Sequence, residues 1–222
     1  MTLQKAGGVS ALIEALAYVV GFVAMATWLN PGDTESWSAA QKLSFVLEQK
    51  MLFQMVTIVI YVLTGVFLVV LAVALHERLK SGSAGLMQVA TAFGLIWAGM
   101  VIASGMVAIV GLEAVATLHA KDAAHATSVW GVVGVIQNGL GGGVEIVGGI
   151  WVLLISIASM QSRALPAALS YLGLIVGVAG ILTVVPGLAE LAVLFGLGQI
   201  LWFSWTGILL LRRAPTDAVT TN

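Results

Sequence analysis

The sequence contains no cysteine and very few charged residues. The lack of cysteine excludes disulfide bonds, iron–sulfur clusters, thiolate metal sites and cysteine nucleophiles. Asp, Glu, Lys and Arg together make up 9% of the 222 residues, whereas an ordinary soluble domain contains about 25%. A chain with so few charges cannot cover a globule in water, which excludes the large classes of soluble enzyme and indicates an integral membrane protein. The net charge of −1 argues against a nucleic-acid partner.

Long apolar stretches make up most of the chain, and 60% of its residues are hydrophobic. A bilayer core about 30 Å thick requires roughly 20 apolar residues in a helix, and these stretches are too long and too continuous to be barrel strands. We therefore predict an all-α polytopic membrane protein, with a single domain of six transmembrane helices over residues 1–213 and a disordered tail over 214–222. The predicted spans are 7–28, 53–75, 86–115, 129–157, 166–185 and 188–211.

The distribution of Lys and Arg predicts the orientation in the membrane. Cytoplasmic segments carry the excess of these residues, and placing both termini in the cytoplasm gives the inside segments the larger share. We therefore expect a multi-pass protein of the bacterial cytoplasmic (inner) membrane with both termini cytoplasmic. The inside segments then hold Lys5, Arg78, Lys80, Arg163, Arg212 and Arg213, and the outside segments hold Lys42, Lys50 and Lys121.

The longest predicted loop, residues 30–50, has the pattern of a short amphipathic helix. Asp33 or Thr34 can cap its start, and Trp37, Leu43 and Leu47 follow at helical spacing. We expect this helix to lie on the outer interface or to cap the bundle. A solvated loop is the alternative.

The predicted spans contain acidic residues without basic partners. No Lys, Arg or His falls well inside a span, whereas Glu14, Glu113, Glu145 and Glu190 lie within or near one. An ionised side chain at the bilayer centre costs about 2.5 kcal/mol or more. Such acids must therefore be protonated, hydrogen-bonded, hydrated or paired with a bound cation. Glu113 and Glu190 lie toward the outer ends of their spans, where headgroups or water reach them.

Glu145 is the best candidate for a functional group, because it lies near the midpoint of the fourth span. Asn138 precedes it by two helical turns and is expected on the same face. Gln199, half-way along the sixth span, is a plausible partner across the bundle, and Tyr18 can hydrogen-bond Glu14 from one turn away. We expect these five residues to form an interior ligand or ion site. Gln137, Tyr61 and Thr64 are further candidates to face an interior cavity.

The glycine-rich run at residues 139–143 leaves two structures open for the fourth span. Consecutive glycines each weaken a helix by about 1 kcal/mol relative to alanine, so the helix can be kinked or unwound at mid-depth, as in broken transporter helices. Alternatively, the small residues allow a tight helix–helix contact, with Glu145 protonated and hydrogen-bonded to a neighbour.

The three histidines lie outside the apolar cores of the spans, which argues against a buried bis-histidine haem. Glu113, His119, Asp122 and His125 form a weak candidate metal site around the second outer loop, where a solvated loop is the favoured interpretation. No lysine lies mid-span to form a retinal Schiff base, and no hydrolase, zinc-protease or phosphate-binding motif is present. We therefore predict no cofactor.

Three stretches of the sequence carry a family resemblance. They are Asn30-Pro31-Gly32-Asp33, residues 144–154 with Glu145 and Trp151, and residues 165–180 from Leu165-Pro166 onward. On these stretches the chain resembles the bacterial membrane proteins of the domain-of-unknown-function family numbered 4386. The resemblance implies a multi-pass membrane protein and singles out Glu145 beside Trp151. Gln199 stands near the position where the family is expected to carry a second acid, and no reaction is implied.

The sequence supports three hypotheses for function. The first is binding or transport of a small molecule, cation or proton at a polar interior site around Glu145. The second is a non-catalytic accessory or scaffold subunit, whose small-residue face on the fourth span packs against a second copy or a partner membrane subunit. The third and least favoured is an intramembrane enzyme acting on lipids. The expected partners are the lipid bilayer and such a ligand or subunit, and nucleic acid is not expected.

Overall fold

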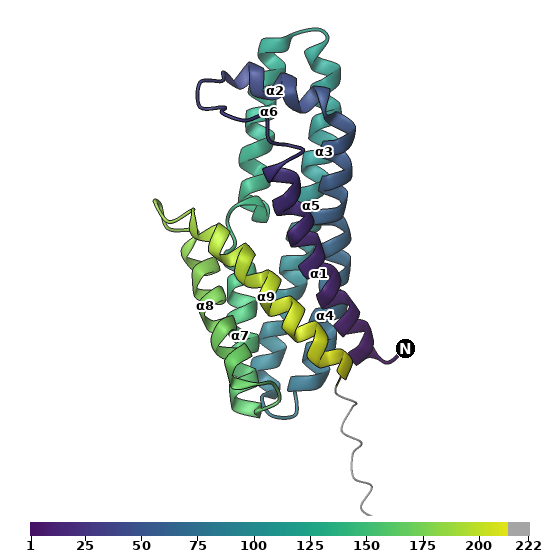
Figure 1. The fold of residues 1–222 in the computed structure, drawn as a ribbon, viewed down its shortest axis with the longest axis vertical. Coiled ribbons are helices and arrows are strands. Elements are labelled where there is room, and N and C mark those ends of the chain that lie inside the picture. Colours follow the sequence, from purple (N-terminus) through teal and green to yellow (C-terminus); the bar gives the residue numbers. More distant parts are fainter. Residues whose placement is uncertain (213–222) are drawn as a thin grey trace, which may run out of the picture.

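The computed structural model describes residues 1–212, and every element in that range is helical (Figure 1). The predicted tail at 214–222 lies outside the described residues. The elements are α1 (Leu3–Ala26), α2 (Ala39–Glu48), α3 (Lys50–Thr57), the π-helical segment η1 (Ile58–Leu63), α4 (Thr64–Leu79), α5 (Ala84–His119), α6 (Ala123–Gln137), the π-helical segment η2 (Asn138–Gly142), α7 (Ile146–Ser162), α8 (Ala167–Leu182) and α9 (Leu191–Arg212).

Five helical runs are long and apolar enough to cross a membrane: Leu3–Ala26, Lys50–Leu79, Ala84–His119, Ala123–Ser162 and Leu191–Arg212. The remaining apolar helix, α8, has 16 residues. At 1.5 Å per residue it is about 24 Å long, which is less than the thickness of the hydrocarbon core. The all-α prediction is confirmed and the helices fit a polytopic membrane protein, while a sixth span stays a prediction.

The bundle is built around α5, which is longer than a membrane span and runs along most of the molecule (Figure 1). In Figure 1, α6 and α2 lie beside its upper part, and α7, α8 and α9 fill the lower part with α4. Helix α1 contacts both α4 and α9, and α5 contacts α4, α6 and α7. The upper half of the bundle, with α2 and α6, therefore meets the lower half, with α7, α8 and α9, near mid-height, between the end of α6 and the start of α7.

The lower half has an aromatic core contributed by α5, α7 and α9. The ring centroid of Trp151 lies 5.6 Å from that of Trp97 and 5.6 Å from that of Trp202. Phe195 and Phe203 pack against the same group, and all five side chains are buried. Offset and edge-to-face aromatic contacts of this kind stabilise a core beyond the area that they bury.

Helices α7 and α8 approach closely through glycine. A Cβ atom added at Gly149 would lie 2.7 Å from the carbonyl oxygen of Gly177 and 2.6 Å from the backbone nitrogen of Ile181. No larger residue fits there without moving one helix. Of the small residues predicted to form one face of the fourth span, Gly149 therefore packs against α8 of the same chain.

The predicted helix in the first outer loop is present as α2, but its predicted cap is wrong. The cap is Ser38, whose Oγ accepts from the backbone N–H of Gln41 at 3.3 Å, while Oε1 of Gln41 accepts from the N–H of Ser38 at 2.8 Å. This reciprocal pair is a capping box. Asp33 instead accepts from the N–H of Glu35 and closes a turn before the helix. The buried Leu43 packs with Val115 and Ala126 of α5 and α6, so α2 covers one end of the bundle.

The glycine run breaks the fourth predicted span. Gly141 has a φ of +100°, a conformation that residues with a Cβ rarely adopt, and α7 does not begin until Ile146. Of the two structures left open for residues 139–143, the helix is therefore interrupted at mid-depth. The break also corrects the expectation that Asn138 and Glu145 share a helical face, because no continuous helix joins them.

Candidate functional site

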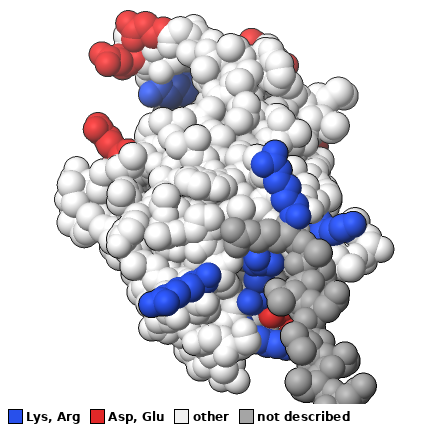
Figure 2. All heavy atoms as spheres, turned by 60° about the horizontal axis from the view of Figure 1, so that its bottom comes forward, with Lys and Arg blue, Asp and Glu red and all other residues white. Residues whose placement is uncertain are grey.

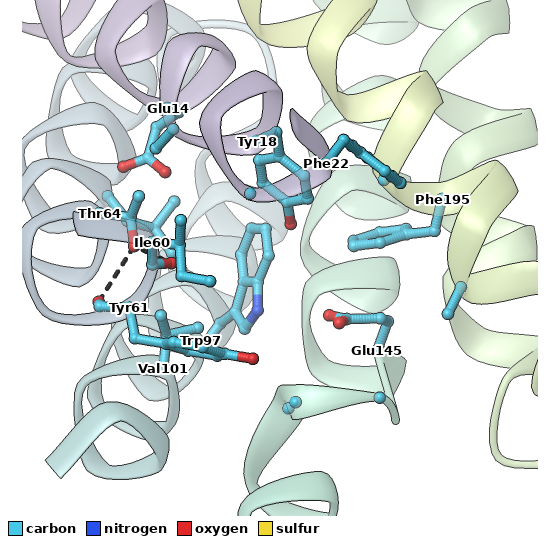
Figure 3. A pocket seen from close by; sticks show the side chains of 18 of the residues that line it. Glu14, Tyr18, Phe22, Ile60, Tyr61, Thr64, Trp97, Val101, Glu145 and Phe195 are labelled. Atoms are coloured by element: carbon cyan, nitrogen blue, oxygen red, sulfur yellow. Dashed lines mark hydrogen bonds between the residues drawn. The ribbon is translucent and has the colours of Figure 1, made fainter. Parts of the chain in front are cut away.

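A cavity of about 390 Å³ lies where the two halves of the bundle meet (Figure 3). Its walls come from α1, η1, α4 and α5 on one side and from the broken segment before α7 and the start of α9 on the other. The lining is mostly apolar. Its side chains with polar atoms are Glu14, Tyr18, Tyr61, Thr64, Trp97 and Glu145.

Glu145 reaches the cavity because the chain leaves helical geometry just before it. Its own φ and ψ are −98° and 22°, and it directly precedes the first residue of α7. Its backbone N–H donates to Oγ1 of Thr183 at 2.8 Å, and that hydroxyl group donates to the carbonyl oxygen of Gly180 at 2.7 Å. The end of α8 therefore anchors the backbone of Glu145. The carboxyl group points into the space beside Trp97, below Tyr18 and Phe195 in the view of Figure 3.

Glu14 brings a second carboxyl group to the same cavity from the middle of α1. Its side chain is 2% exposed, and its Oε1 atom has no hydrogen-bond partner in the part of the chain that the structure describes. Tyr18, one turn further along α1, lies within electrostatic range of both Glu14 and Glu145. In Figure 3 the two carboxyl groups lie on opposite sides of Tyr18 and Trp97.

The π-helical segment η1 and the start of α4 supply the opposite wall. Oγ1 of Thr64 donates back to the carbonyl oxygens of Ile60 and Tyr61 at 2.9 and 3.0 Å, the second bond being dashed in Figure 3. Tyr61 lines the cavity on this side, and its phenol group lies within reach of the side chain of Gln137 at the end of α6. A π-helix holds one more residue in the turn than an α-helix does, and such turns occur often at functional sites.

Asn138 and Gln199 do not line this cavity. Asn138 begins η2, and its Oδ1 atom lies near Gly143. Gln199 is fully buried within α9, and among the described residues neither its Oε1 nor its Nε2 atom has a hydrogen-bond partner. The expected contact between Gln199 and Glu145 is therefore not formed, because the side chains of α9 that face the cavity lie nearer its start.

The candidate metal ligands of the outer loop are engaged elsewhere. The carboxylate of Glu113 accepts from Nζ of Lys50 at 2.6 Å and from Nε2 of Gln54 at 2.7 Å. Asp122 caps α6 by accepting from the backbone N–H of His125 at 2.9 Å. Across residues 1–212 the structure gathers no group of three or more His, Asp or Glu side chains able to hold a metal ion.

The sequence did not single out three of the aromatic residues in the walls of the cavity. Phe22, Trp97 and Phe195 line it together with Tyr18 and Tyr61. In an apolar span these residues have the same pattern as ordinary core or lipid-facing residues, so no sequence signal separates them. The polar residues were easier to find, because each of them interrupts an apolar stretch.

A family model described as Domain of unknown function (DUF4386) matches residues 6–212. The matched range covers nearly the whole chain and includes Glu14 and Glu145 of the cavity. No curated protein and no solved structure matches the chain.

Proposed function

The chain belongs to the family described as Domain of unknown function (DUF4386), and from its cavity we propose that it is a membrane protein that binds a small molecule or cation between its helices. One observation carries this proposal. Glu14 on α1 and Glu145 just before α7 face one cavity, and within residues 1–212 no Lys, Arg or His side chain lines it.

The cavity has the properties of a ligand site. Its volume of about 390 Å³ falls within the range of roughly 300–1,000 Å³ that small-molecule pockets occupy. Apolar walls with a few converging polar groups are also typical of such pockets. Carboxyl groups within membrane helices commonly mark the path of an ion or substrate, and broken helices frame the binding sites of many transporters. We extend the proposal to transport, in which the bound ligand moves across the membrane.

The charge distribution supports the proposed orientation, with both termini in the cytoplasm of a bacterium. Lys and Arg side chains gather over the end of the molecule where the N-terminus lies, whereas acidic side chains appear at the opposite end (Figure 2). The ends of helices α1, α4, α7 and α9 bring these basic residues together, which follows the positive-inside rule. Within the described chain they are Lys5, Arg78, Lys80, Arg163 and Arg212.

The binding proposal explains more of the structure than the two alternatives. A scaffold role drew on the small-residue face of the fourth span, and Gly149 on that face is already packed against Gly177 of α8. An enzyme role drew on the four residues of the outer loop, where Glu113 is paired with Lys50 and Asp122 caps a helix. Neither arrangement accounts for the cavity.

A screen for ligands that stabilise the protein tests the proposal. The purified protein is heated with each member of a library of small amines, acids and neutral compounds. A ligand present at 100 times its Kd stabilises the folded state by about 2.7 kcal/mol, which raises the unfolding temperature by roughly 5–11 °C. We expect a set of compounds to produce such a shift.

A cavity-filling variant shows where those compounds bind. Ala17 lines the cavity, so the variant Ala17→Phe should abolish the shift. Ala92 is exposed on α5, and Ala92→Phe, which adds the same ring away from the cavity, should retain it. If no compound stabilises the parent protein, or if Ala17→Phe keeps every shift, the proposed function is wrong.

A further inference from the structure

We propose that the natural ligand of the cavity is an organic ammonium ion with an apolar or aromatic body, rather than a neutral molecule, an anion or a bare metal ion. This inference rests on the proposed binding function and names the chemical class of the ligand. It follows from the charge, the walls and the opening of the cavity.

The charge of the cavity calls for a cation. Glu14 and Glu145 are the acidic residues of the lining, and the described lining contains no basic residue to balance them. Oε1 of Glu14 is buried and lacks a hydrogen-bond donor within residues 1–212. A buried polar atom without a partner costs about 1–3 kcal/mol. An ammonium group that enters the cavity supplies the missing positive charge, and one that carries an N–H also supplies the missing donor. An anion would add repulsion.

The walls of the cavity favour an organic cation. Five of the lining residues are aromatic: Tyr18, Phe22, Tyr61, Trp97 and Phe195. They come from α1, η1, α5 and α9, so rings face the cavity from several directions (Figure 3). A cation over the face of such a ring is attracted by about 0.5–2 kcal/mol, and quaternary ammonium ligands are recognised in this way.

A bare metal ion does not fit the same walls. Calcium requires six to eight oxygen ligands, and magnesium requires six in near-ideal geometry. The lining offers two carboxyl groups, two phenol groups and one threonine hydroxyl group spread over several helices. The hydroxyl group of Thr64 already donates to its own helix. A volume of about 390 Å³ is also far larger than one ion needs, so an apolar body must fill the remaining space.

The opening of the cavity suits a ligand that arrives from the lipid. Met25 near the end of α1 and Val193 near the start of α9 both line the cavity and are 62% and 53% exposed. The rim therefore lies between two apolar helix ends, beside Gly142 and Gly143 of the broken segment. An ammonium ion with an apolar body partitions into a membrane more readily than a hydrated metal ion does, and Met25 and Val193 present apolar side chains to it.

The test compares three compounds of similar size: benzyltrimethylammonium, its uncharged isostere neopentylbenzene, and the anion phenylmethanesulfonate. Binding of each radiolabelled compound to the full chain is measured by equilibrium dialysis. The protein is held in phosphatidylcholine nanodiscs, which carry no net charge, and empty nanodiscs give the background. We expect the cation to bind at least about tenfold more tightly than its isostere, and we expect no binding of the anion.

Matched variants assign the effect to the two acids. Glu145→Gln and Glu14→Gln keep the shape of each side chain and should each weaken cation binding by about tenfold. Glu190→Gln is the control, because Glu190 is exposed in the turn before α9 and does not line the cavity. It should leave the Kd unchanged.

The outcomes separate this inference from the proposed function. If neopentylbenzene binds as tightly as the cation and Ala17→Phe abolishes both, the cavity is a ligand site but the inference of a cation is wrong. If the sulfonate binds most tightly, the inference is also wrong. If none of the three compounds binds and the ligand screen finds no Ala17-dependent shift, both proposals fail. The comparison of compounds on the parent protein requires no variant to fold.

Discussion

At Glu14 and Glu145, ligand binding and proton binding compete for the same carboxyl groups. The other titratable groups of the lining are the phenols of Tyr18 on α1 and Tyr61 on η1, which stay neutral in acid. The residues that α4, α5 and α9 contribute to the lining do not titrate. Lowering the pH adds a proton to the acids, removes their negative charge and weakens the hold on a cation. We therefore predict that, as the pH falls below neutral, the affinity for benzyltrimethylammonium falls by up to about tenfold per pH unit for each carboxyl group that takes up a proton.

Equilibrium dialysis over a series of pH values measures this slope. Glu145→Gln should flatten it, because fewer protons are then taken up when the cation leaves, and Glu190→Gln should preserve it. A Kd that is constant between neutral and acidic pH, or an affinity that rises in acid, would contradict the prediction.

At the scale of the element, the break before α7 depends on the left-handed backbone of Gly141. A Cβ atom added there meets no atom within 4 Å, so the cost of Gly141→Ala comes only from its φ of +100°. A residue other than glycine in such a conformation costs about 1–3 kcal/mol. We predict that Gly141→Ala lowers the free energy of unfolding by about that amount, measured by denaturant unfolding in detergent, and weakens ligand binding by displacing Glu145.

Gly139→Ala is the matched control for this prediction. Gly139 lies in the same π-helical segment, also has open space around its Cβ position, and has no positive φ. Alanine is the better helix former by about 1 kcal/mol, so Gly139→Ala should leave the stability unchanged or raise it. If both substitutions had the same effect, the break would not depend on the conformation of Gly141.

The same segment shows what the sequence could and could not predict. The glycine run at 139–143 indicated a weak helix, because backbone freedom is a local property, and the break was one of two stated structures. The position of Asn138 relative to Glu145 was predicted wrongly, because helical spacing holds only along an unbroken helix. Glu14 was expected in one site with Glu145, and Tyr61 was expected to face an interior cavity, but the sequence did not predict the π-helical segment η1. Their shared cavity depends on how α1 packs against α4 and α9, which is a tertiary property.

At the scale of the whole molecule, the cluster of basic residues at one end predicts how the protein lies in a membrane. Lys80 follows α4 and Arg163 follows α7 at the same end as the first and the last described residues.

Since the chain has no cysteine, single-cysteine variants report topology without background. Ser81 and Ser36 form a matched pair, because both are exposed serines in loops at opposite ends of the bundle. We predict that a membrane-impermeant thiol reagent added to intact bacterial spheroplasts labels Ser36→Cys and does not label Ser81→Cys until the membrane is permeabilised. The reverse pattern would place the basic end outside, against the positive-inside rule, and equal labelling of both variants before permeabilisation would contradict a bundle that spans the membrane in one orientation.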